Sequence, residues 1–225
     1  MPSRGLPSAA CHVVVTASAG IAITFGVWLV RLFVRTTLRK PFGTDDIHCT
    51  IATFCGILNS ALAIGETDHG LGQRESEIAP WIVRRQQQMA WVANMSFILA
   101  LCFAILSVSY LLVRITKLTS LVRVTYAVPI ATSLWAVVAF CLITFQCKLP
   151  DPWDFEPQSR CIDIYHTWAG IVIANAVLDV GNVVAAIVLV TNIRIPTKTK
   201  VFIIVLFSMR LMYPHLTHVM PGEEH

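Results

Sequence analysis

The chain has 225 residues, of which 56% are hydrophobic and only 13% are charged, whereas soluble domains have about 25% charged residues. This composition excludes an ordinary soluble domain. The length is that of one domain, and we expect no separate soluble catalytic domain beside several membrane spans. The net charge of +4 suits contact with anionic lipid headgroups and does not favour nucleic-acid binding.

Five apolar segments are each long enough to cross a bilayer, which takes about 20 helical residues. They cover residues 13–33, 47–64, 89–113, 126–145 and 167–190. A sixth, at 201–211, is short and is interrupted by Arg210, which indicates a partial or re-entrant segment. We therefore predict an all-α, polytopic transmembrane helix bundle with five full spans and a partial sixth. The bundle is expected at 13–207, between an N-terminal tail at 1–12 and a divergent C-terminal tail at 208–225.

Lysines and arginines are distributed unequally between the two ends of these segments. The connections after the first, third and fifth segments, with the segment ends beside them, hold ten, and the opposite side holds six that are mixed with acidic residues. Because cytoplasmic loops are enriched in Lys and Arg, we expect the N-terminus outside. The two longest connections, 66–88 and 146–166, then lie outside, where ligands commonly reach a bundle. The plasma membrane is the expected location.

Cys147 and Cys161 bracket the second outside connection, which also contains Trp153. In an oxidising exterior such a pair can close a disulfide, and a loop of about 15 residues is then constrained by roughly 3 kcal/mol. Two free thiols are the alternative, and we favour the disulfide.

Asp179 lies near the middle of the fifth segment, four residues after Asn175, so both side chains share one helix face. A carboxylate at this depth costs on the order of 2.5 to 3.5 kcal/mol on insertion scales, which makes it a functional candidate. We treat Asn175 and Asp179, with Trp153 in the connection above, as ligand-binding candidates. The alternative is a structural polar cluster in which Asp179 is protonated or bonded to Asn59, Asn94 or a hydroxyl group of another span.

The sequence Gly43-Thr44-Asp45-Asp46 begins the second segment directly after a basic stretch. Asp45 and Asp46 suit the positive end of that helix and can pair with the preceding arginines, so capping explains them without catalysis. His48 is the only nearby histidine, and no set of His, Cys and Asp residues has the spacing of metal ligands. Motifs for nucleophiles, phosphates or dinucleotides are also missing. We therefore expect no enzyme activity, metal or cofactor.

Covalent binding of retinal requires a lysine inside a helix, where its amine forms a Schiff base. The five lysines all lie in connections or at segment ends: Lys40, Lys117, Lys148, Lys198 and Lys200. Covalent retinal is therefore not expected.

A set of residues recurs in order along the segments: Arg31, Arg35, Gly43, Asp45, Asp46, Gly70, Gly72, Ser107, Tyr110, Arg114, Cys147, Trp153, Cys161, Asn175, Asp179 and Pro196. As a set they resemble the fungal rhodopsin-like integral membrane domain, a family of seven-helix, receptor-like membrane proteins. The resemblance covers about 13–207 and implies a bundle open to the outside.

Three features depart from this family's pattern. Ile105 stands where the family usually has a lysine, and Ala185 and Ala186 stand where it usually has prolines. The similarity is expected to end after Phe207 with no seventh segment, which suggests a truncated or altered C-terminus.

Together these features predict a receptor-like sensor without covalent retinal, in contact with the lipid bilayer, an unknown small-molecule or surface ligand outside, and a cytoplasmic signalling partner. One alternative is a proton-coupled transporter in which Asp179 titrates. Another is a non-functional, truncated member of the family.

Overall fold

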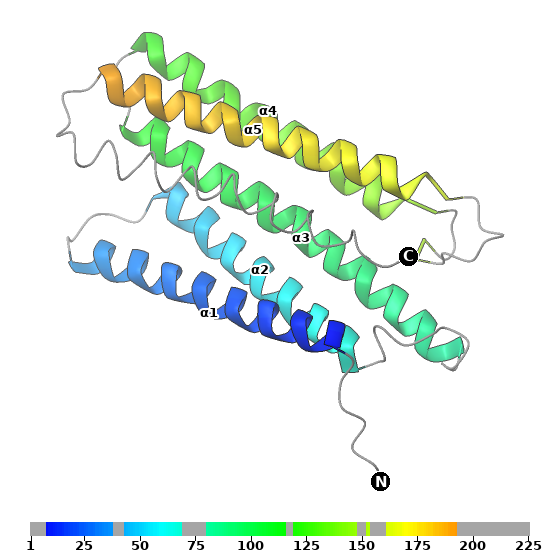
Figure 1. Cartoon of the computed structure of the whole chain (residues 1–225). Coiled ribbons are helices and arrows are strands. Elements are labelled where there is room, and N and C mark those ends of the chain that lie inside the picture. Colours follow the sequence, from blue (N-terminus) through cyan, green and yellow to red (C-terminus); the bar gives the residue numbers. More distant parts are fainter. Residues whose placement is uncertain are drawn as a thin grey trace.

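A computed structural model of the chain describes residues 8–37, 43–68, 80–115, 119–147, 152–153 and 161–192. These residues form five helices, which are α1 (Ser8–Thr37), α2 (Thr44–Asp68), α3 (Pro80–Ile115), α4 (Thr119–Thr144) and α5 (Ile164–Asn192) (Figure 1). All five are long and apolar enough to cross a membrane. The predicted all-α bundle with five full spans is thus confirmed, and the partial sixth span expected at 201–211 lies outside the described residues.

The helices extend beyond the apolar segments from which they were predicted. The helix α3 begins at Pro80 instead of residue 89, and proline is favoured at the first helical position. The expected connection at 66–88 is therefore wrong at both ends, because α2 runs to Asp68 and residues 80–88 are helical. Hydrophobicity marks only the part of a helix that lies within the hydrocarbon core of the membrane. The 36 residues of α3 extend about 54 Å at 1.5 Å each, well beyond a hydrocarbon core of about 30 Å.

Two further predicted boundaries differ from the helix ends in the structure for the same reason. The helix α1 begins at Ser8, so the last residues of the expected tail at 1–12 are helical. The helix α5 begins at Ile164, inside the expected connection at 146–166. Polar helix ends of this kind carry no apolar signal in the sequence.

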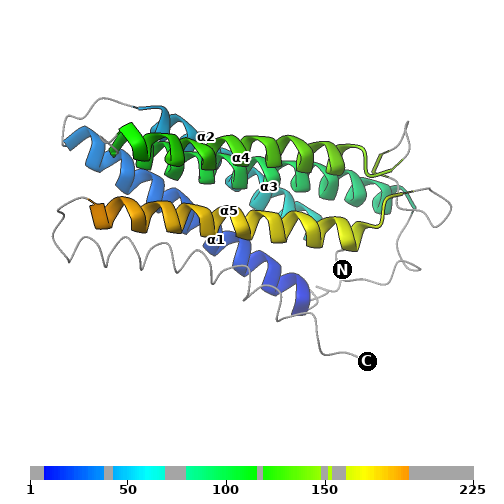
Figure 2. The ribbon, with the colours of Figure 1, turned by 90° about the horizontal axis from the view of Figure 1, so that it is seen from above.

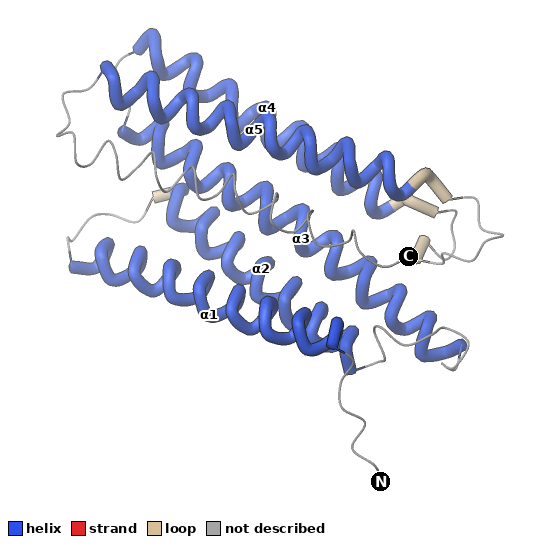
Figure 3. Tube along the Cα trace, in the orientation of Figure 1, coloured by secondary structure: helices blue, strands red, loops and turns tan. Residues whose placement is uncertain are grey.

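The helix α3 is the centre of the described bundle. It packs against α2 on one side and against α4 and α5 on the other, while α1 packs against α2 (Figures 1 and 2). The tube in Figure 3 shows the helices extending lengthwise along the bundle, and Figure 2 shows that α1 crosses the others at an angle. Outward-facing side chains of α1 and α4 are apolar and exposed, as expected for lipid contact. Examples are Phe33, Leu134 and Val137.

Three clusters of buried apolar residues join α3 to α4 and α5. Their members are Ile98, Ala139, Ile143 and Ile171 in the first, Cys102, Leu106 and Ala136 in the second, and Leu112 with Ala186 in the third. These contacts set the register of the three helices, and thereby decide which polar side chains of α3 and α5 can meet.

The end of α4 and the start of α5 are joined covalently. Cys147 and Cys161 form a disulfide with a Cα–Cα distance of 4.1 Å, which confirms the predicted pairing. The backbone N–H of Ile162 also donates a hydrogen bond to the carbonyl oxygen of Gln146 at 2.8 Å. The disulfide therefore fixes one mouth of the bundle.

Candidate functional site

The ends of three helices meet in a charged cluster made of Arg31, Arg35, Asp45, Asp46 and Arg114. The two α1 arginines contact both acids in the first turn of α2, and Arg35 lies against Asp45 and Asp46 in the same way as Arg31. The distances from Arg31 are 3.0 Å to Asp45 and 3.1 Å to Asp46. Arg114 Nη1, in the last turn of α3, lies 3.2 Å from Asp45 Oδ1. This arrangement contains the expected pairing of the acids with α1 arginines and adds a third partner from α3.

Gly43 caps the start of α2 and leaves space for the side chains of this cluster. Its N–H donates a hydrogen bond to Asp46 Oδ2 at 3.2 Å, and its carbonyl oxygen accepts one from the Asp46 N–H at 3.0 Å. Asp46 therefore caps the start of α2, as the third residue does in a capping box. A Cβ atom on Gly43 would lie 2.5 Å from Arg114 Nη1, so any larger residue would displace the cluster.

The first turn of α2 is also held by α3. The Ser107 hydroxyl donates a hydrogen bond to the carbonyl oxygen of Asp45 at 2.9 Å, in a buried position. The ring of His48 packs against Tyr110 with a centroid distance of 5.0 Å. These contacts place Asp45 so that its side chain is only 1% exposed. A carboxylate buried to this degree needs charged partners, because an isolated buried charge is strongly unfavourable.

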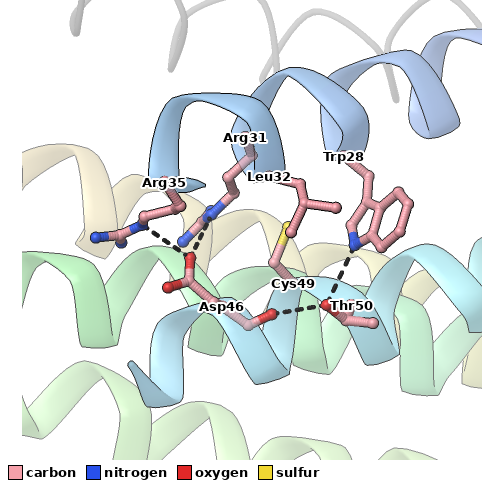
Figure 4. A pocket seen from close by; sticks show the side chains of 7 residues that line it. All are labelled: Trp28, Arg31, Leu32, Arg35, Asp46, Cys49 and Thr50. Atoms are coloured by element: carbon pink, nitrogen blue, oxygen red, sulfur yellow. Dashed lines mark hydrogen bonds and ion pairs between the residues drawn. The ribbon is translucent and has the colours of Figure 1, made fainter. Parts of the chain in front are cut away.

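A narrow crevice between α1 and α2 adjoins the charged cluster (Figure 4). Its volume is about 20 Å³, and it is lined by Trp28, Arg31, Leu32, Arg35, Asp46, Cys49 and Thr50. The indole N–H of Trp28 donates to Thr50 Oγ1 at 3.1 Å, and the Thr50 hydroxyl donates to the Asp46 carbonyl at 3.0 Å. The crevice is therefore polar and charged at one end and aromatic at the other.

A second group of polar side chains lies inside the membrane-spanning part, between α3 and α5. Asn175 Nδ2 donates to Asp179 Oδ2 at 3.3 Å, and the Ser109 hydroxyl donates to Asn182 Oδ1 at 2.8 Å. Asp179 is 9% exposed and Asn182 is 2% exposed. The expected pairing of Asn175 and Asp179 on one face is present. Asn182 was missed, although its position three residues after Asp179 places it on the same face.

Three buried polar atoms of α4 and α5 lack a partner among the described residues. They are Trp135 Nε1, Asn175 Oδ1 and Asn182 Nδ2. Buried polar groups are normally hydrogen-bonded, so such atoms call for a water, a ligand or a functional explanation. Together they are two donors and one acceptor, contributed by α4 and α5.

Trp153 lies at the disulfide end and not beside these polar groups. Its ring contacts Trp91 of α3 edge-on at 5.9 Å, and Trp91 Nε1 donates to the carbonyl oxygen of Ile143 at 3.2 Å. Asn175 lies eleven residues beyond Ile164, about 16 Å along α5. The three ligand-binding candidates thus divide between the mouth and the interior. Gly70 and Gly72 lie outside the described residues.

The charged cluster and the disulfide lie at opposite ends of the bundle. Trp91, which contacts Trp153, and Arg114, which contacts Asp45, are 23 residues apart on α3, or about 34 Å. This exceeds the hydrocarbon thickness of about 30 Å. The two ends therefore belong to opposite membrane surfaces.

The start of α5 carries an exposed acid–histidine pair. His166 Nδ1 lies 2.7 Å from Asp163 Oδ2, and the His166 N–H donates to Asp163 Oδ1 at 3.3 Å. These hydrogen bonds from His166 lower the pKa of Asp163. Within the described part of the chain, no group of three or more His, Cys, Asp and Glu residues could hold a metal ion.

Five long apolar helices around buried polar side chains define a multi-pass helical membrane protein. Residues 30–218 match the family model of the fungal rhodopsin domain, and the chain belongs to this family. Comparisons with curated proteins and with solved structures gave no match. The family match runs past residue 207, so the expected end of the similarity at that point is wrong.

Proposed function

We propose that this chain is a receptor-like, non-enzymatic sensor of the plasma membrane that passes a signal to a cytoplasmic partner. Its N-terminus and the disulfide-linked mouth face outside. The excess of Lys and Arg on the opposite side supports this orientation. The charged cluster, with three of these arginines, lies on that side.

The observation that carries the proposal is the group of unpartnered polar atoms inside the membrane-spanning part. Asn175 Oδ1, Asn182 Nδ2 and Trp135 Nε1 are buried without a hydrogen-bond partner among the described residues. A ligand with two acceptors and one donor would satisfy them where water is scarce. Hydrogen bonds formed there are not weakened by competition with bulk water. The sensed compound is therefore a small, mostly apolar molecule with a few polar groups.

Thermal unfolding of the purified chain tests this with a panel of such compounds. A compound at 100 times its Kd should stabilise the wild type by about 2.7 kcal/mol. Asp179→Asn and Asn182→Leu should abolish the shift, whereas Val184→Ala, at a 52% exposed position on the outer face of α5, should leave it unchanged. Shifts that persist in both polar variants would overturn the assignment of this site.

We also propose that retinal is not bound covalently, because the described helices contain no lysine. The purified chain should show no visible absorbance band after incubation with all-trans-retinal, and borohydride treatment should leave no covalent product. A retinyl adduct on any peptide of the chain would contradict this.

Proton-coupled transport is the second candidate, supported by the carboxylate of Asp179 in the middle of a span. Proteoliposomes with an imposed pH gradient separate the two functions. A sensor should show no internal acidification above that of empty vesicles. A proton flux that disappears in Asp179→Asn would favour the transporter.

A further inference from the structure

We propose that the crevice between α1 and α2 binds the phosphate group of an anionic phospholipid, with an acyl chain lying against Trp28. This site is separate from the sensor site between α3 and α5. It does not depend on the proposed function, because it needs only that the helices lie in a bilayer.

The first step is the charge of the site. Three guanidinium groups face two carboxylates in the cluster, so arginines outnumber acids there. Arg31 and Arg35 bind the acids through Nε and Nη2, and Nη1 of both has no partner among the described residues. Guanidinium groups bind phosphate oxygens well, since their planar donors match its geometry.

The second step is accessibility from the lipid. The side chains of Arg31 and Arg35 are 25% and 12% exposed, whereas Asp45 is 1% exposed. An approaching ligand therefore meets arginine before it meets a carboxylate. The crevice volume of about 20 Å³ accommodates about one water, so it takes a single phosphate oxygen while the remaining oxygens stay at the rim.

The third step is the apolar continuation of the crevice. Trp28 and Arg35 are two turns apart on one face of α1, so the indole lies about 10 Å deeper in the membrane than the guanidinium. Trp28 stacks with Phe25 at 5.7 Å. On α2, Phe54 lies one turn beyond Thr50 and is 69% exposed. A charged head at Arg35 and an aromatic surface toward the membrane centre match the two ends of a phospholipid (Figure 4).

Native mass spectrometry of the full chain in detergent tests the proposal with phosphatidic acid and phosphatidylcholine. The wild type should bind phosphatidic acid at least fivefold more tightly than phosphatidylcholine. Arg35→Gln should reduce this binding about fivefold, the effect of one basic residue near an anionic lipid. Arg85→Gln is the matched control, because Arg85 is exposed on the far end of α3.

A second variant keeps every charge. Cys49→Phe should fill the crevice and weaken phosphatidic acid binding, whereas Cys141→Phe, at an exposed free cysteine of α4, should not. Circular dichroism and an intact Cys147–Cys161 disulfide verify folding of each variant. Equal binding of the two lipids, or unchanged binding by Cys49→Phe, would overturn the proposal. Displacement by equimolar inorganic phosphate would also overturn it, because the site would then bind free phosphate and not lipid.

Discussion

Asp45 and Arg114 are 69 residues apart in the sequence, yet Arg114 Nη1 lies 3.2 Å from Asp45 Oδ1. The contact joins the first turn of α2 to the last turn of α3. Because the same carboxylate also contacts Arg31 and Arg35 of α1, one buried acid holds three membrane spans together.

We expect Asp45→Ala to be strongly destabilising, because it leaves three arginines facing a site without its central charge. Removal of one partner from a buried ion pair costs about 3–5 kcal/mol. Arg114→Ala should cost less, because this side chain is 36% exposed. The measurement is the free energy of unfolding in detergent, with Arg85→Ala as an exposed control that should stay within about 0.5 kcal/mol.

A double-mutant cycle of Asp45→Ala and Arg114→Ala isolates the contact between these two side chains. The cycle should give a coupling energy of about 0.5–3 kcal/mol, as expected for residues in one network. Strictly additive effects would mean that Asp45 is stabilised by its α1 partners alone.

Gly43→Ala should destabilise the chain by about 1–3 kcal/mol, the usual cost of overpacking. The new Cβ would lie 2.5 Å from Arg114 Nη1 and even closer to the Asp45 carboxylate. Gly56→Ala is the control inside α2, the helix that Gly43 precedes, because a Cβ on Gly56 meets nothing within 4 Å. It should be neutral or stabilising by about 0.5–1 kcal/mol. Melting temperatures of the two variants that shift in the same direction would contradict this explanation.

The sequence predicted the spans well because apolar runs of sufficient length have few alternatives to crossing a membrane. It also predicted the pairing of Asp45 with α1 arginines, since a short connection brings the two helix ends together. Arg114 was not predicted as a partner, because nothing in one sequence tells which face of α3 meets α2. The start of α3 at Pro80 was missed because polar helix ends have no apolar signal.

The interior site was predicted only in part, for a related reason. Asn175 and Asp179 share a face by helical spacing alone. The partner of Asn182 depends on the register between α3 and α5, which is set by the buried cluster that contains Ile98 and Ile171. The alternative in which Asp179 bonds to Asn59 or Asn94 also depends on the register between helices, and it stays a prediction.

The hydrogen bond from Ser109 to Asn182 supports a prediction on stability. Ser109→Ala removes the donor 2.8 Å from Asn182 Oδ1 and leaves a buried acceptor without it. We expect a loss of about 1–2 kcal/mol, in the range found for hydrogen bonds between membrane helices. In the double variant Ser109→Ala with Asn182→Leu no unpaired amide remains, so its unfolding free energy should be closer to that of the wild type. Equal or greater loss in the double variant would contradict this account.

The pair of Asp163 and His166 predicts a pH effect at the N-terminal end of α5. The hydrogen bonds from His166 lower the pKa of Asp163 in the folded state. The stabilisation is therefore present above the ordinary aspartate pKa of about 4 and is lost as the pH falls through the lower, folded value. His166→Ala should raise the titration midpoint of Asp163, measured by carboxyl ¹³C NMR. His12→Ala, at an exposed position of α1, is the control and should leave the titration midpoint of Asp163 unchanged. Equal midpoints in the wild type, His166→Ala and His12→Ala would argue that the hydrogen bonds from His166 do not lower the pKa of Asp163.

The Cys147–Cys161 disulfide should contribute about 3 kcal/mol to stability, because it closes a loop of about 15 residues. Cys147→Ser with Cys161→Ser removes this constraint and releases the connection that places Trp153 against Trp91. Thermal unfolding with and without reductant measures the effect. Reductant should lower the stability of the wild type to that of the double variant and leave the double variant unchanged.

Cys141→Ser is the matched control for this comparison, because Cys141 is an exposed free thiol six residues before Cys147 on the same chain segment. It should change stability by less than about 0.5 kcal/mol and remain sensitive to reductant. If reductant destabilised the double variant as much as the wild type, the effect would arise from another thiol and not from this disulfide. Stabilisation by the disulfide would then have no support, and neither would its role in fixing this end of the bundle.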